Sequence, residues 1–309
     1  MIKLDKHLFW KENFMNTENL HFFLGGSDLE MKTIKALLDK HGIAYSDAGL
    51  SWGASTSKYG DEITEIAAKG KTPVIVELAV DSKLPENTIN IDHHNENSDK
   101  PASILQVCEL LGIEPTRKMQ MVAANDSGYI PAMIAMGATK EEIAQIRYQD
   151  RATQGITPEQ EKQAEIAIKN STEMLGVTIV VLEHSKTATV TDRLFDTSKP
   201  QNLLIISADG ETNYFGPEDI CRALQGKKIG ERPASWDPTQ TEVLYDNFGG
   251  WVGGAGLGQK GGIAFWGGYA NQKEIIQFVL KANAEKQQSK TVAEDVAMAQ
   301  FLNNLAHMK

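Results

Sequence analysis

The sequence predicts an α/β protein: a mostly parallel sheet flanked by helices, followed by a second, smaller mixed α/β domain that carries a glycine-rich loop. Two observations favour this class. Up to about residue 150, short apolar runs alternate with helix-length amphipathic segments, as in parallel sheets with crossover helices. Beyond that point, strand-like runs follow one another with short gaps, which is typical of antiparallel neighbours.

The first half is predicted to contain four strands and five helices. Asp28 and Gly42 bracket the first helix as capping residues, and Ser98 or Asp99 are candidate caps of the third, with Pro101 in its first turn. The predicted strands lie within residues 20–26, 43–49, 72–80 and 88–92. The predicted helices lie within residues 28–42, 61–70, 102–112, 117–128 and 140–152.

The second half begins with a charged amphipathic segment, residues 157–176, which is predicted to be a helix that connects the two domains. Strands are predicted within residues 177–184, 187–195 and 202–208, and helices within residues 217–226, 271–286 and 292–307. The expected domains are therefore a metal-binding α/β domain at 1–155, a helical connector at 156–176, and a substrate-binding α/β domain at 177–309.

Composition limits the class of partner. The formal net charge of −10 and the pI near 5.3 argue against charge-driven binding to long duplex nucleic acid. They leave room for a small phosphorylated substrate or a short oligonucleotide, because a metal ion reverses the local field in a cleft. The two cysteines are expected to be reduced and buried, and the longest apolar runs are strand-sized. These features favour a cytoplasmic protein without membrane contact; the oligomeric state stays open, a homodimer included.

The stretch "INIDHH" carries the most specific signal. A short apolar run, Ile89 to Ile91, leads directly into Asp92, His93 and His94. Ligands of open parallel sheets bind beyond the carboxyl ends of the strands. Further acids fall near such ends or in a later helix, namely Asp28, Glu77 and Asp126. A set of imidazoles and carboxylates suits Mn²⁺ or another octahedral divalent ion better than a zinc site built on thiolates.

With its polar loop, the helix "PASILQVCELLG" and the later "AANDSGYI", this stretch resembles motifs of the DHH phosphoesterase superfamily. That superfamily includes RecJ-type nucleases, nanoRNases, cyclic-dinucleotide phosphodiesterases and family II inorganic pyrophosphatases. The resemblance covers most of the chain in outline, and residues 87–130 carry the specific motifs. It implies an α/β domain joined by a helix to a smaller domain, and hydrolysis that depends on one or two Mn²⁺ ions.

The resemblance also implies roles for individual residues. His93 and Asp126 would be metal ligands, His94 would contact the metal or the scissile phosphate, and Asp92 would orient the pair of histidines. Glu77 would hold the place of the family's second-motif aspartate, with Asp81 as a possible substitute. The first motif normally supplies two aspartates. In the stretch "GGSDLEM", either Gly26 replaces the first and Asp28 is the second, or Asp28 and Glu30 form the pair.

The glycine-rich segment between Phe248 and Gly268 holds ten of the 26 glycines. Its "GLGQKG" run leads into a strand-like stretch rather than a helix, so a dinucleotide fingerprint fails on context. The resemblance implies that this loop binds the substrate's phosphate, through Gly256, Gly258 and Lys260. The alternative is close backbone packing in a tight turn. Arg193, with His184 and Lys186, is placed on strands of the second domain, where it would face the substrate; the alternative for all three is an ordinary surface position.

Two functions of different classes follow. The first is metal-dependent hydrolysis of a phosphodiester or phosphoanhydride bond in a small nucleotide-type substrate, with Asp92 and His94 as catalytic residues. The second is a non-catalytic protein that binds a nucleotide or a partner with a degenerate site, which Gly26 and Glu77 favour. The physiological substrate and the number of bound metal ions stay open.

Overall fold

A computed structural model describes residues 17–288, except residues 52, 236, 255–256 and 260–261. The chain divides into two compact units, Met1–Ile156 and Thr157–Lys309, and each has its own hydrophobic core. Among the described helices, none combines the length and the apolar character that a bilayer crossing requires.

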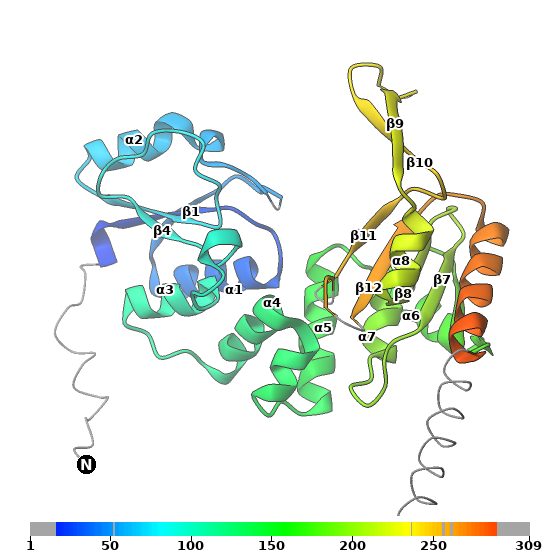
Figure 1. Ribbon diagram of the computed structural model, residues 1–309. Coiled ribbons are helices and arrows are strands. Elements are labelled where there is room, and N and C mark those ends of the chain that lie inside the picture. Colours follow the sequence, from blue (N-terminus) through cyan, green and yellow to red (C-terminus); the bar gives the residue numbers. More distant parts are fainter. Residues whose placement is uncertain (1–16, 52, 236, 255–256, 260–261, 289–309) are drawn as a thin grey trace, which may run out of the picture. The chain divides into compact units, whose positions relative to one another are not determined.

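The first unit contains a four-stranded parallel sheet in the order β2-β1-β3-β4 (Figure 1). Its strands are β1 (Leu20–Leu24), β2 (Ala44–Asp47), β3 (Thr72–Val76) and β4 (Ile89–Ile91). Its helices are α1 (Leu29–His41), α2 (Gly60–Ala68), α3 (Ser103–Leu111), α4 (Arg117–Ala135) and α5 (Lys140–Thr153). Short 3₁₀ turns occupy Thr17–Asn19, Thr56–Lys58 and Asn95–Asn97.

Helices cover both faces of this sheet, which is why its strands are apolar on both sides. On one face, Phe22 and Val74 pack with α1 and α3 residues such as Ile34 and Ile104. On the other face, Phe23, Ile75 and Leu78 pack with Tyr59 and with Ile63 of α2. Figure 1 shows α2 on one side of the strands and α1 with α3 on the other. The predicted parallel sheet is thus confirmed.

Two predicted caps of α3 are wrong. The residue before this helix is Ala102, which offers no side-chain cap, and neither Ser98 nor Asp99 reaches its first turn. Ser98 ends the preceding 3₁₀ turn instead. The first-turn N–H of Ile104 donates to a carboxylate from α1, Glu30 Oε1, at 3.0 Å. A buried acid from a distant segment therefore replaces the local cap that the sequence suggested.

The second unit is a mixed six-stranded sheet in the order β11-β12-β8-β7-β6-β5, in which only the β6–β7 pair is parallel among the strands described. These strands are β5 (Thr172–Met174), β6 (Val177–Leu182), β7 (Leu203–Ser207), β8 (Thr212–Pro217), β11 (Trp251–Gly253) and β12 (Ile263–Gly268). A separate antiparallel hairpin joins β9 (Lys228–Pro233) and β10 (Thr241–Tyr245).

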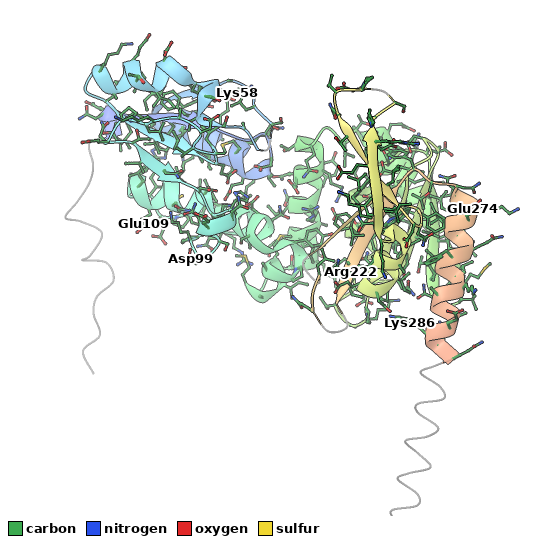
Figure 2. The ribbon with its side chains drawn as sticks, turned by 45° about the horizontal axis from the view of Figure 1, so that its top comes forward. Lys58, Asp99, Glu109, Arg222, Glu274 and Lys286 are labelled. Carbon is green, nitrogen blue, oxygen red and sulfur yellow. The ribbon has the colours of Figure 1, made fainter. Side chains whose placement is uncertain are left out.

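Helices also cover both faces of this second sheet. α6 (Pro158–Lys169) and α7 (Ala188–Leu194) pack on one face through Ala164 and Val190, which meet Val180 and Ile205. α8 (Glu218–Gln225) and the helix at 272–288 pack on the other through Ile220 and Ile275, among others. Figure 2 shows Arg222, Glu274 and Lys286 projecting from these two helices; all three are exposed.

Two further predictions of secondary structure are wrong. Residues 187–195, predicted as a strand, contain helix α7. Burial of Thr189 and Val190 against the sheet overrides the weak β-propensity of the run. The predicted helix of residues 157–176 ends at Lys169, and β5 forms a hairpin with β6. Leu175 and Gly176, with φ of 50° and 71°, make the tight two-residue turn.

Candidate metal centre

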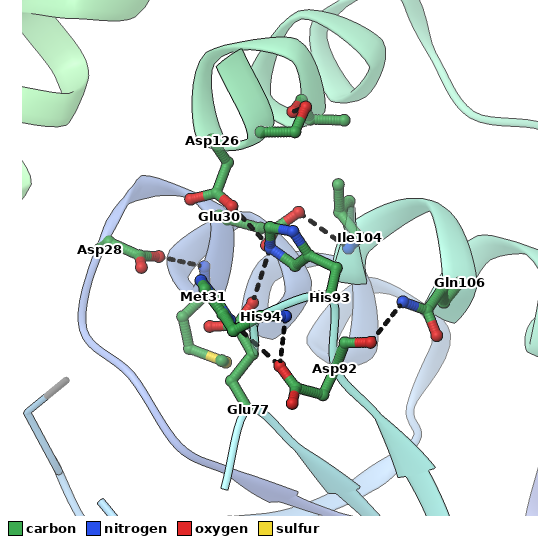
Figure 3. A network of polar contacts seen from close by, with 12 residues as sticks. Asp28, Glu30, Met31, Glu77, Asp92, His93, His94, Ile104, Gln106 and Asp126 are labelled. Carbon is green, nitrogen blue, oxygen red and sulfur yellow. Dashed lines mark hydrogen bonds and ion pairs between the residues drawn. The ribbon is translucent and has the colours of Figure 1, made fainter. Parts of the chain in front are cut away.

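Three strands of the first sheet deliver acidic or imidazole side chains to the edge where parallel strands end. The chain leaves β1 through Gly25 and Gly26 to Asp28, leaves β3 at Glu77, and leaves β4 into Asp92, His93 and His94. α4 contributes Asp126 from two residues before a break in the helix at Gly128 and Tyr129. The structure thus brings together most of the predicted ligands, as Figure 3 shows.

Glu77 reaches the site through a left-handed backbone conformation, with φ of 54°. Non-glycine residues adopt this conformation rarely, and it costs on the order of 1–3 kcal/mol. The turn is held by the Glu77 N–H, which donates to the Ile91 carbonyl oxygen at 2.9 Å. Gly25 lies against the same turn, because a Cβ there would meet the Glu77 carbonyl oxygen at 2.3 Å. Glycine at position 25 therefore allows Glu77 to turn into the site.

His93 is the centre of the group. Its Nε2 lies 2.7 Å from Asp126 Oδ2, 3.4 Å from Glu30 Oε2 and 3.5 Å from Glu77 Oε1. The side chains of His93, Glu30 and Glu77 are at most 7% exposed, and that of Asp126 is 19% exposed. None of these four atoms has a hydrogen-bond partner outside the group among the residues described. Four buried polar atoms from four different segments thus point at one another.

This arrangement fits a divalent cation. Buried polar atoms are nearly always hydrogen-bonded, so a cluster without such bonds needs another source of compensation. Ligand atoms of Glu77, His93, His94 and Asp126 all lie within 4.8 Å of one another. One or two imidazoles with carboxylates suit Mn²⁺, Fe²⁺ or Zn²⁺. A bound ion would satisfy the lone pairs that the protein leaves unpaired.

The pKa values in the cluster follow from this crowding. The carboxylates of Asp126, Glu30 and Glu77 raise the pKa of His93 to about 12. Burial raises the pKa of Glu30 to about 9. Burial also pushes the pKa of Glu77 upward, but the contacts with His93 and Glu30 outweigh it and leave this pKa lowered. Without a cation, the group therefore holds protons at neutral pH that a metal would displace.

His94 is set apart from His93 by its hydrogen bonds and its exposure. Its Nδ1 lies 3.0 Å from Asp92 Oδ1, which also accepts the His94 backbone N–H at 3.0 Å. Asp92 Oδ2 accepts a bond from Asn97, and Gln106 donates to the Asp92 carbonyl oxygen at 3.2 Å. The His94 side chain is 34% exposed. The bond at Nδ1 fixes the ring, so that Nε2 is the nitrogen available to a ligand.

Asp28 lies at the margin of the group. Its Oδ1 caps α1 by accepting the Met31 N–H at 2.8 Å, and burial raises its pKa to about 6. A Cβ added at Gly26 would lie 3.8 Å from Asp28 Oδ2 and 3.6 Å from Glu77 Oε2. Of the two arrangements that the sequence left open, the structure brings Glu30 to His93 and leaves Gly26 facing the carboxylates without a side chain.

Asp81, the possible substitute for Glu77, lies elsewhere. It accepts bonds from Thr56 Oγ1 and from the Ser57 N–H, both at 2.9 Å, and so supports the 3₁₀ turn Thr56–Lys58. Hydrogen bonds from Ser55 and Ser57 hold the pKa of Asp81 well below its usual range. Asp81 is therefore a turn residue rather than a member of the cluster.

A cavity of about 520 Å³ opens beside the cluster. Its lining includes the predicted residues Asp28, His94 and Asp126, and also residues that no sequence pattern singled out: Ser27, Asn125, Arg147, Asp150 and Gln154. Arg147 lies on α5, far from any strand end, which is why strand-end reasoning missed it. Its spacing of three residues from Asp150 was the available signal, and the two form an ion pair of 2.6 Å.

The predicted substrate-binding residues belong to the second unit. Arg193 lies on α7 rather than on a strand, and its Nη2 pairs with Glu161 at 2.7 Å and with Glu165 at 3.2 Å. The Gly258 N–H donates to Glu218 Oε2 at 2.9 Å. Gly256 and Lys260 lie outside the described residues.

His184 and Lys186 are likewise not on a strand. The two residues lie in the connection between β6 and α7, at 184 and 186. His184 Nε2 is 3.0 Å from the Gln160 carbonyl oxygen, and its Nδ1 accepts the Lys186 N–H at 3.1 Å. Both ring nitrogens of His184 are therefore engaged in local contacts.

No protein-family model and no curated protein matches this chain. Among solved structures, RecJ from Thermus thermophilus in complex with Mn²⁺ is similar at 10% identity and a TM-score of 0.36, over 90% of this chain. The chain spans about half, 53%, of that RecJ chain. The pGpG-specific phosphodiesterase PggH from Vibrio cholrae is similar at 9% identity and a TM-score of 0.33, over 86% of this chain and 99% of PggH. An uncharacterized Helicobacter pylori protein is similar at 12% identity and a TM-score of 0.26, over 85% and 99% of the two chains. All three TM-scores lie below 0.5, so the function proposed next is drawn from this chain's own residues.

Proposed function

We propose that this protein is a metal-dependent hydrolase of a phosphodiester or phosphoanhydride bond in a small nucleotide-type substrate. One observation carries the proposal: three buried carboxylate oxygens converge on His93 Nε2, and none of these four atoms has a hydrogen-bond partner outside the group among the residues described. The resemblance of the "IDHH" and "NDSG" stretches to DHH phosphoesterase motifs supports it. Short oligonucleotides and cyclic dinucleotides are the expected substrates.

Glu77, His93 and Asp126 would hold the metal. Glu30 would contact His93, and Asp28 would line the cavity beside the cluster. Mn²⁺ is the ion we propose, as one or two ions per chain. Such an ion, when bound, acts as a Lewis acid that neutralises phosphoryl charge and makes water a better nucleophile at neutral pH. The protein's own part is to fix the ligands, and it does so from three strand ends and two helices.

His94 would serve the reaction at the cavity wall, and Asp92 would hold its ring in place. The hydrogen bond between Nδ1 and Asp92 holds the imidazole in one orientation, with Nε2 as the nitrogen available to the substrate. His94 Nε2 can then hold a proton for the leaving oxygen, since general acids must lie within hydrogen-bond reach of the group they protonate. Asp92 acts on the substrate only through His94.

The test is a paired measurement of metal content and turnover. The purified full chain is assayed for Mn, Fe, Co and Zn, and for hydrolysis of bis(p-nitrophenyl) phosphate and of a dinucleotide with Mn²⁺ added. We expect His93→Ala and Asp126→Ala to lose bound metal and at least about 100-fold in kcat/KM. The matched controls are His41→Ala and Asp99→Ala, which remove exposed side chains of the same unit (Asp99 is marked in Figure 2). Equal activity in all four variants would refute the assignment.

A second candidate function is nucleotide binding without turnover. Gly26 favours it, since this position faces Glu77 and Asp28 but contributes no ligand. A protein that binds Mn²⁺ and a dinucleotide, yet hydrolyses neither the dinucleotide nor the aryl phosphate, would establish this candidate in place of the first.

A further inference from the structure

The cavity beside the metal cluster has an unbalanced charge. Its lining includes three carboxylates, Asp28, Asp126 and Asp150, and Arg147 is the only lysine or arginine among the described residues that line it. A volume of about 520 Å³ lies within the usual range for small-molecule sites, roughly 300–1,000 Å³. A phosphorylated ligand entering this cavity meets one positively charged side chain of the protein besides any bound metal.

Arg147 is held in place rather than free to move into solvent. It is 8% exposed, and its Nη1 donates to Asn125 Oδ1 at 2.9 Å and to Asp150 Oδ2 at 2.6 Å. The centre of its guanidinium lies 4.6 Å from the centroid of the Tyr129 ring. These contacts fix the guanidinium at the cavity wall, which lowers the entropy cost of binding an anion there.

The contact with Tyr129 depends on the break in α4. Tyr129 has φ of 57° and ψ of −150°, a conformation that strains a residue with a side chain. Gly128 precedes it, and a Cβ at Gly128 would meet the Ala132 Cβ at 2.7 Å. Pro131 follows, where the continuation of the helix tolerates it. The strain is therefore localised at the residue whose ring lies against Arg147, three residues after the proposed ligand Asp126.

We infer that Arg147 binds a phosphoryl group of the substrate in the cavity beside the metal cluster, and that Tyr129, Asn125 and Asp150 position it for this. Arginine suits the task because its guanidinium is always charged and forms charge-assisted hydrogen bonds with phosphate oxygens. The inference rests on the proposed function for its substrate class, but it concerns recognition rather than bond cleavage. The alternative is a buried ion pair with Asp150 that only stabilises the fold.

The test separates recognition from stability and from chemistry. Arg147→Met, Arg147→Lys and Tyr129→Leu are compared with Arg232→Met, which removes an exposed arginine of the β9–β10 hairpin. KM and kcat are measured with the 5′-phosphorylated dinucleotide pApA and Mn²⁺. We expect Arg147→Met to raise KM roughly 10-fold or more, with a smaller fall in kcat, as for the loss of a charge-assisted hydrogen bond. Arg147→Lys keeps the charge but loses the fork, and its KM should lie between those of wild type and Arg147→Met.

Binding and stability measurements decide the remaining outcomes. Inorganic phosphate is titrated into the Mn²⁺-loaded proteins by calorimetry, and Tm and Mn content are recorded for each variant. An Arg147→Met protein with lowered Tm but unchanged KM and phosphate affinity would overturn the inference and leave the hydrolase standing. A wild type that binds phosphate through Arg147 but hydrolyses nothing would keep the inference and refute the hydrolase. If Arg147→Met does not fold, the KM and phosphate affinity of Arg147→Lys and Tyr129→Leu are compared with those of wild type and Arg232→Met instead.

Discussion

Glu30 connects two parts of the first unit that are 74 residues apart: its Oε1 accepts the backbone N–H of Ile104 at 3.0 Å. Its other oxygen, Oε2, lies 3.4 Å from His93 Nε2. One carboxylate thus caps α3 and faces the candidate metal site at the same time (Figure 3). Substitutions at position 30 can separate these two contributions.

Glu30→Gln keeps an oxygen that can accept from Ile104 but removes the carboxylate, whereas Glu30→Ala removes both. Burial raises the pKa of Glu30 and so favours its neutral form in the ion-free protein, and the amide resembles that form. In EDTA we expect Glu30→Gln to unfold within about 1 kcal/mol of wild type, and Glu30→Ala to lose about 1–3 kcal/mol. Both should bind Mn²⁺ more weakly. Urea unfolding and Mn²⁺ titration check this; equal instability of the two variants in EDTA would speak against the capping role.

Metal addition should raise thermal stability through the cluster. A ligand at 100 times its Kd stabilises by about 2.7 kcal/mol, which corresponds to a rise in Tm of roughly 5–10 °C for a unit of this size. We expect Mn²⁺ to give such a rise in wild type, EDTA to reverse it, and His93→Ala to show none. Calorimetric scans with and without Mn²⁺ make the measurement. A His93→Ala protein that still gains the full rise would place the ion elsewhere.

The two glycines after β1 should differ in how well they tolerate alanine. A Cβ at Gly25 would lie 2.3 Å from the Glu77 carbonyl oxygen and 2.5 Å from that of Val76, whereas the nearest atom to a Cβ at Gly26 is 3.6 Å away. Gly25→Ala should therefore destabilise the first unit by at least about 1–3 kcal/mol and weaken Mn²⁺ binding. Gly26→Ala should stay within about 0.5 kcal/mol of wild type. The comparison needs only urea unfolding curves; similar losses in both variants would mean that the turn adapts.

The two cysteines should resist alkylation in the native protein. Burial raises the pKa of Cys108 to about 11 and that of Cys221 to about 12. Since the thiolate is the reactive form, its fraction at pH 8 is on the order of 0.1% or less, and it grows as pH rises toward these values. Iodoacetamide labelling followed by mass spectrometry should be slow at pH 8 and fast at both sites in urea. Rapid native labelling of Cys108 would contradict its burial against α1.

Sequence reasoning succeeded where the signal is local. The apolar runs that end in Glu77 and in Asp92 identified two parallel strands. Because parallel strands end at one edge of the sheet, the sequence predicted that Glu77 and His93 lie close together, as they do. It failed where tertiary packing decides. Thr189 and Val190 have the pattern of a strand but lie in α7, since their burial is a property of the folded sheet.

The remaining parts of the site depend on long-range placement. The only local signal at Arg147 is its three-residue spacing from Asp150, and this spacing does not reveal the break in α4 that places Tyr129 against it. Glu30 was only one of two alternatives for the same reason: which residue of the "GGSDLEM" stretch turns inward depends on how α1 packs. No short pattern in the chain records either relationship.

The bond between Glu30 and Ile104 also bears on how the first unit folds. α3 has nine residues and no side-chain cap from its own segment, so in isolation it is too short to persist in water. The hydrogen bond that caps its first turn comes from Glu30 and forms only when α1 has docked. Bringing these segments together closes a loop of 74 residues, which costs conformational entropy. We therefore expect α1, β4 and α3 to form in a single cooperative step. Hydrogen exchange should show their amides opening together, with no early helical intermediate at residues 103–111.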